Sequence, residues 1–161
     1  MKRVKIGDVY KIKTPKGFVL LHYVYEDKVN GQMVRVLPGF FEDEPENLVG
    51  LISDSELFSV FFPLQSAHRK GLVEKISNHS LPENYKKPEY MRSRHVIRGE
   101  FKGWHIINTK TKKRELVKEL SNFQIGLSPW GIWNDTLLVE RLVEGWTPER
   151  EARRYSPRAS M

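Results

Sequence analysis

The sequence predicts an α+β fold, in which a curved antiparallel sheet or partial β-barrel carries a C-terminal amphipathic helix packed on it. Two observations predict this class. The first sixty residues alternate short β-branched and aromatic runs with Pro, Gly and Asn-Gly turn signals. The stretch 127–146 holds three of the four tryptophans and one helical apolar stripe. We expect one domain over 1–147, followed by a short helical or frayed basic tail over 148–161.

The N-terminal elements read as strands joined by tight turns. Residues 9–13 and 18–25 have strand composition, and Pro15 and Gly17 stand between them in turn positions. Asn30-Gly31 between two apolar runs predicts a hairpin whose returning strand is 33–37. The acidic segment, residues 42–46, contains Pro45 and is expected to be an exposed loop.

The middle of the chain predicts further short strands. They are expected over 48–52, 57–64, 71–76, 90–97 and 103–107, with a polar turn over 108–113. Residues 115–120 fit either a returning strand or a short helix. The whole set amounts to a sheet of five to seven strands.

A helix over about 135–144 is predicted from its apolar face and both of its ends. Leu138, Leu142 and Trp146 recur at four-residue spacing. Asn134 or Asp135 can cap the start, and Gly145 stands where a helix end favours positive φ. Thr147-Pro148 then has the form of a second helix start.

Composition narrows the class of protein. The 161 residues include no cysteine, so disulfides and thiol chemistry are excluded. We see no signal-peptide core and no run long enough for a membrane span, and therefore expect a soluble, cytoplasmic protein without membrane partners. The net charge of +7 is unevenly spread, because residues 1–64 sum to −1 and residues 65–161 to +8.

Sequence motifs for catalysis are missing. There is no GxxxxGK or GxGxxG loop and no HExxH pattern, and the five histidines lack metal-ligand spacing. We therefore predict no catalytic residue, no cofactor and no metal site. One enzymatic alternative stays open, in which His95 or His105 acts as general base on RNA while Arg92, Arg94 or Arg98 binds the phosphate.

The N-terminus carries a family resemblance. The phrase VKIGDVYKIKTPKGFVLLHYV opens a strand with Gly-Asp-Val, continues to a central isoleucine and turns at Pro-Gly. The matching residues are Gly7, Asp8, Val9, Ile12 and Gly17. This resembles the opening of the immunity protein 26 family, small bacterial proteins associated with polymorphic toxin systems. The resemblance implies a small β-rich domain that inhibits by binding.

These observations favour a non-enzymatic binding protein, most concretely an immunity-type inhibitor of a bacterial toxin. Its acidic segment would steer a basic protein partner, and exposed aromatic side chains would anchor it. The candidate partner-binding residues are Phe40, Phe41, Glu42, Asp43, Glu44, Glu46, Trp104 and Trp130. Trp133 and Trp146 flank the predicted helix and are expected in the core, which leaves Trp104 and Trp130 as the exposed indoles.

The alternative function is a nucleic-acid-binding module in the basic second half. Lysine and arginine would contact phosphates while an indole stacks on unpaired bases. The candidate residues are Arg92, Arg94, Arg98, Lys110, Lys112, Lys113 and Arg114.

Overall fold

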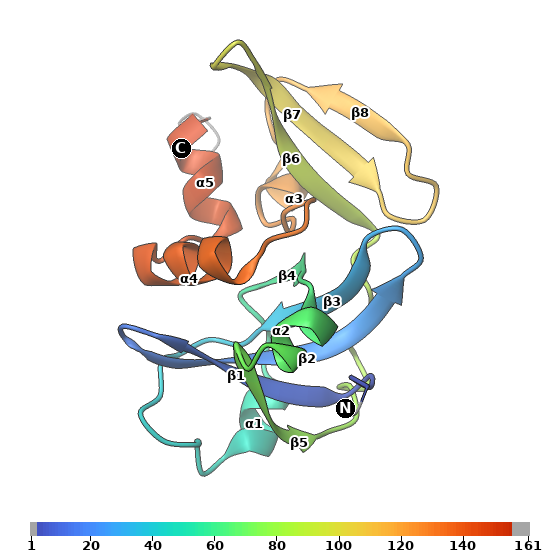
Figure 1. The fold of residues 1–161 in the computed structure, drawn as a ribbon. Coiled ribbons are helices and arrows are strands. Elements are labelled where there is room, and N and C mark those ends of the chain that lie inside the picture. Colours follow the sequence, from blue (N-terminus) through green and yellow to red (C-terminus); the bar gives the residue numbers. More distant parts are fainter. Residues whose placement is uncertain (1–2, 156–161) are drawn as a thin grey trace. The chain divides into compact units, whose positions relative to one another are not determined.

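The computed structural model describes residues 3–155, and the chain forms two compact units (Figure 1). The first combines residues up to Lys87 with Ile132–Gly145, and the second combines Pro88–Gly131 with the residues from Trp146 on. The fold is α+β, with one antiparallel sheet in each unit. Both sheets are open, so the barrel form is not the one adopted. A single domain over 1–147 stays a prediction.

The first unit is built on a five-stranded sheet with the order β4-β3-β2-β1-β5. Its strands are β1 (Asp8–Thr14), β2 (Gly17–Asp27), β3 (Gly31–Val36), β4 (Phe58–Phe61) and β5 (Val73–Asn78). The expected hairpin joins β2 to β3, with Asp27 paired to Gly31. Bulges in the β1–β5 and β2–β3 pairings are the kind of irregularity that bends and twists a sheet.

Helices cover both faces of this sheet. α4 (Asp135–Glu144) lies against β1, as Figure 1 shows, and buries Leu138 and Leu142. On the other face, Ile52 of α1 (Leu48–Ser53) packs in a cluster with Val9 and Leu20. Successive side chains along the strands point to opposite faces of the sheet, so apolar side chains are buried on both faces.

α4 confirms the helix predicted from the sequence at both ends. The Asn134 side chain accepts a hydrogen bond from the Leu137 backbone N–H at 2.8 Å. Gly145 ends the helix in the left-handed conformation, with φ of 74°. Trp133, just before the cap, is buried and lies 5.4 Å from the Phe58 ring, as its assignment to the core requires.

Two short helices replace expected strands. Residues 48–52 belong to α1, because Asn47 caps the segment and the Leu48–Ile52 side chains turn one face toward the sheet. The strand expected over 57–64 is shorter than predicted, since Pro63 ends it and α2 (Leu64–Arg69) begins. Composition misled here because short apolar runs fit buried helix and strand equally well.

The second unit is built on a three-stranded antiparallel sheet with the order β6-β7-β8. These strands are β6 (Tyr90–Ile97), β7 (Glu100–Asn108) and β8 (Arg114–Val117), so the open choice for 115–120 resolves mainly to strand. α3 (Asn122–Ile125) and α5 (Pro148–Tyr155) complete the unit. Residues 148–155 of the expected tail are thus helical, while 156–161 lie outside the described residues.

Trp104 is the centre of the second core, which corrects its assignment as an exposed anchor. Its exposed fraction is 0%, and it packs with Ile106, Leu127 and Ala152 of α5. Trp104 points to the α5 face of β7 because residues 104 and 106 share that face, a consequence of strand periodicity. Trp104 is therefore not one of the exposed indoles.

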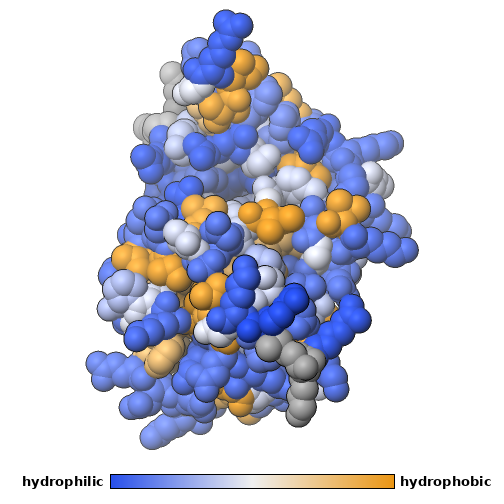
Figure 2. Space-filling view, viewed as in Figure 1, coloured by the Kyte–Doolittle hydropathy of each residue, from blue (hydrophilic) through white to orange (hydrophobic). Residues whose placement is uncertain are grey.

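The described helices are short, and the face drawn in Figure 2 is mostly hydrophilic with scattered hydrophobic side chains. None within residues 3–155 combines the length and the apolar character needed to cross a membrane.

Candidate functional site

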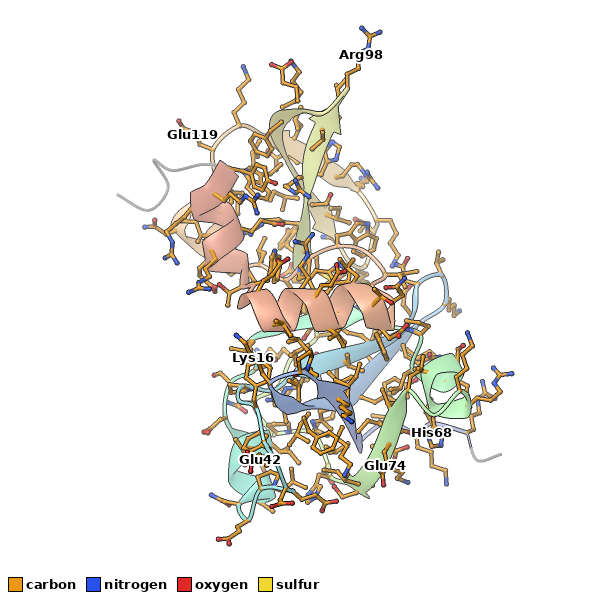
Figure 3. All side chains as sticks on the ribbon, turned by 60° about the vertical axis from the view of Figure 1, so that its left-hand side comes forward. Lys16, Glu42, His68, Glu74, Arg98 and Glu119 are labelled. Carbon is orange, nitrogen blue, oxygen red and sulfur yellow. The ribbon has the colours of Figure 1, made fainter. Side chains whose placement is uncertain are left out.

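The acidic segment, residues 42–46, is exposed at all four of its carboxylates. Glu42, which is labelled in Figure 3, is the first of them. The segment begins at a fixed point, because the Phe18 N–H donates to the Phe41 carbonyl at 2.7 Å. Phe41 is half-buried, whereas Phe40 is 40% exposed. Of the two phenylalanines proposed as anchors, Phe40 is the more accessible.

The other end of this region is held by a buried arginine. Arg35 of β3 is 1% exposed, and its guanidinium donates to the carbonyls of Ile52 at 3.0 Å and Asp54 at 2.6 Å. Its Nε lies 3.4 Å from the Glu56 carboxylate. These carbonyls stand at the C-terminal end of α1, where backbone acceptors have no partner within the helix. Arg35 therefore ties the end of α1 to the sheet.

His22 completes this network from the neighbouring strand. Arg35 and His22 are paired across β2 and β3, and Arg35 Nη1 donates to His22 Nδ1 at 3.2 Å. Since Nδ1 accepts, Nε2 carries the proton and donates to the His79 carbonyl at 3.0 Å. The ring is fully buried. Burial, with the Arg35 charge added, lowers the pKa of His22 below its ordinary value.

This depressed pKa makes stability depend on pH. Below the ordinary histidine pKa of about 6.5, His22 binds a proton in the unfolded chain but stays neutral in the folded chain. Stability of the first unit is therefore full above about pH 6.5 and falls as pH drops, by up to about 1.4 kcal/mol per pH unit. Urea denaturation at about pH 7.5 and 5.5 measures this loss. The variant His22→Gln should show a flatter dependence, and an unchanged slope would contradict the assignment.

A pocket of about 300 Å³ opens beside the Arg35 network. Its lining carries both signs of charge, with Arg35 and Lys86 set against Asp54 and Glu56. Tyr85 lies over the Arg35 guanidinium at 5.7 Å, and burial raises its pKa to about 12. No cluster of metal-ligating side chains occurs in the part of the chain the structure describes. The buried member of this lining is Arg35, which is held by the hydrogen bonds described above.

In the second unit, Arg92 has a structural role, which corrects its assignment as a phosphate contact. It is 1% exposed and stacks 4.6 Å from the Trp104 ring centre. Its guanidinium donates to the carbonyls of Gln124, Ile125 and Pro148. A guanidinium with these partners cannot also bind a phosphate without breaking the core. Arg92 thus joins the end of α3 to the start of α5.

The other candidate basic residues lie at the surface. Arg94 is partly exposed and pairs with Glu151 at 3.6 Å, and Arg98 stands at the tip of the β6–β7 hairpin, directed outward in Figure 3. The remaining four form a cluster that we call the basic turn. It consists of Lys110, Lys112, Lys113 and Arg114, all exposed.

The basic turn has a defined backbone, in agreement with the turn expected over 108–113. The Asn108 side chain accepts from the backbone N–H groups of Lys110 and Thr111 at 2.9 and 3.0 Å. Lys112 adopts a left-handed φ of 65°, and its ammonium lies 5.3 Å from the Trp130 ring centre. Trp130, a partner-binding candidate, is half-buried beside this turn.

His95 and His105 come together on β6 and β7, with ring centres 4.5 Å apart. Slight desolvation, followed by the charges of His95 and Arg114, lowers the pKa of His105. Two of the arginines named with them already have partners in the fold. Arg92 is buried, and Arg94 pairs with Glu151. The reading as an RNA-cleaving site stays a prediction.

The residues behind the family resemblance are structural. Gly7 has φ of 96°, and a Cβ there would lie 2.8 Å from the His79 carbonyl oxygen. Asp8 is buried and accepts from the Lys5 N–H at 2.9 Å and the Asn78 amide at 2.9 Å. A Gly-Asp pair therefore starts β1 for reasons of backbone and hydrogen bonding. Comparison with protein-family models, curated proteins and solved structures finds no match to this chain.

Sequence reasoning missed Arg35 and His22. A signal was present, since each stands alone inside an apolar strand run, between Val34 and Val36 and between Leu21 and Tyr23. A single polar or charged side chain within such a run is buried only if it has hydrogen-bonding or charged partners.

Proposed function

We propose that this protein is a non-enzymatic binding protein, most concretely an immunity-type inhibitor whose acidic segment occludes the surface of a basic toxin. The observation that carries the proposal is the Arg35 network, which fixes the end of α1 behind the exposed carboxylates. A region ordered before binding loses less conformational entropy when the partner docks. Phe40 and the 63% exposed Val49 supply apolar contacts beside the charges.

The local charge favours a basic partner. No lysine or arginine occurs between Arg35 and Arg69, while six carboxylates fall in that interval. Opposite charge on the partner would speed encounter more than it deepens affinity.

Charge reversal tests the proposal. Partner proteins are captured on the wild-type protein from a nuclease-treated lysate of the source cells, purified, and mixed with each variant by stopped flow. Replacing Glu42, Asp43, Glu44 and Glu46 by Lys should slow association by about tenfold or more at low salt. The matched control reverses four exposed carboxylates elsewhere in the same unit, Glu26, Glu74, Glu83 and Glu140. If both variants slowed association equally, the effect would come from net charge alone, and the proposed role of the acidic segment would be wrong.

A second candidate, nucleic-acid binding by the second unit, is favoured by how charge divides between the units. The second unit has 13 Lys or Arg against 6 Asp or Glu, a net of +7, whereas the first has 14 of each. All of the chain's excess charge therefore belongs to one unit. The basic turn, with Trp130 beside it, offers phosphate contacts and a stacking surface.

Salt dependence tests this second candidate. Fluorescence anisotropy with labelled uridine and duplex oligonucleotides at about 50 and 200 mM salt should show steep weakening. Replacing Lys112, Lys113 and Arg114 by Ala should flatten the logarithmic salt slope by about 0.7 to 0.9 per lost phosphate contact. Absence of binding at about 50 mM salt would eliminate this function.

A further inference from the structure

The three-stranded sheet has β6 and β8 at its edges, and within the described residues only the β6 edge is partly covered. Beside β6, the segment 128–130 adds a short bridge, with the Arg92 N–H donating to Ser128 at 3.0 Å and the Trp130 N–H to Arg92 at 2.8 Å. β8 pairs with β7 only, and Figure 1 shows it as the outer strand of this sheet. Among residues 3–155, no strand lies along its other side.

The register shows which backbone groups of β8 face outward. The Asn108 N–H donates to the Lys113 carbonyl at 2.9 Å, and the pairing continues with Ile107 opposite Arg114. Hydrogen-bonded positions alternate in an antiparallel pair, so Glu115 bonds to β7 as Lys113 does. The N–H and C=O of Arg114 and Leu116 therefore point away from β7. No hydrogen bond joins these groups to another described residue.

The charges around this edge indicate which kind of polypeptide segment fits beside β8. Lys113 and Arg114 stand at its start and Lys118 follows its end, with Glu115 as the one carboxylate among them, while Leu116 is 52% exposed. A second copy of β8 would bring like charges together: a parallel in-register one places Arg114 beside Arg114, and an antiparallel one centred on Glu115 places Glu115 opposite Glu115. Like charges on adjacent strands are unfavourable, whereas carboxylates beside Lys113, Arg114 and Lys118 are attracted.

We propose that β8 accepts an extended, acidic polypeptide segment of a partner protein as a fourth strand. Its backbone would bond to Arg114 and Leu116, its carboxylates would lie among the lysines, and an alternate aliphatic side chain would cover Leu116. This edge belongs to the second unit and is independent of the acidic segment in the first.

The experiment uses the full chain and a short capped peptide of alternating Glu and Val as the probe. Nuclear magnetic resonance should show slowed amide exchange at Arg114 and Leu116 when the peptide binds, with little change at Glu115. A peptide with Lys in place of Glu should not bind. Amide changes confined to other residues, or no binding of the acidic peptide at millimolar concentration, would overturn the proposal.

Two variants separate backbone pairing from charge. Leu116→Pro removes an outward N–H and should weaken peptide binding at least tenfold, while Leu116→Thr keeps that N–H and should bind within about threefold of the wild type. If Leu116→Pro disturbs the sheet, the double change Lys113→Glu and Lys118→Glu should give the same weakening without altering the backbone. An acidic peptide that binds and is displaced by a uridine oligonucleotide, yet itself leaves Arg114 and Leu116 unprotected, would point to a polyanion surface and overturn strand addition.

Discussion

Replacing Arg35 by methionine is expected to destabilise the first unit by about 3–5 kcal/mol, although methionine fills much of the same volume. The substitution leaves the Ile52 carbonyl and the Nδ1 of His22 buried without their donor, and it also removes the donor to the more exposed Asp54 carbonyl. A buried acceptor without a donor destabilises the fold because it has lost its hydrogen bonds to water and gained none in the protein. Urea denaturation, followed through the amide signals of Leu21 and Val34, measures the loss.

The control for this change is Arg69→Met in the same unit. Arg69 is exposed, so its replacement should alter the free energy of unfolding by no more than about 0.5 kcal/mol. If Arg35→Met were equally mild, the guanidinium would not be what holds the end of α1, and the ordered acidic surface would lose its physical basis.

Replacing Trp104 by alanine is expected to destabilise the second unit by about 3–5 kcal/mol. The indole is fully buried, and its removal leaves a cavity between the sheet and α5 while depriving the Arg92 guanidinium of its aromatic partner at 4.6 Å. Denaturation followed through the amide signals of Ile106 and Ile107 tests it.

Phe123→Ala is the matched aromatic control, because Phe123 is 69% exposed in the same unit. Its replacement should cost no more than about 0.5 kcal/mol. A Trp104→Ala protein as stable as this control would place the indole at the surface and restore it as a candidate anchor.

Local signals explain what could be predicted from the sequence. α4 has its cap, its apolar stripe and its terminal glycine within twelve consecutive residues, so its bounds follow without knowledge of any distant contact. The β2–β3 hairpin is equally local, since Asn30-Gly31 stands between two apolar runs.

The misassigned residues depend on contacts far along the chain. Arg92 looked like a solvated phosphate contact, but its partners at Gln124, Pro148 and Glu151 come from elements 32 to 59 residues away. Arg35 likewise reaches Ile52 and Asp54. Composition cannot distinguish a buried arginine with backbone acceptors from an exposed one, because the acceptors carry no sequence signature.

Amide hydrogen exchange of the protein with and without its captured partner tests the central claim most directly. If the acidic segment and α1 form the docking surface, exchange should slow across residues 40–56 when the partner binds and stay unchanged over 108–117. Slowing confined to 108–117, with residues 40–56 unaffected, would contradict the proposed role of the acidic surface.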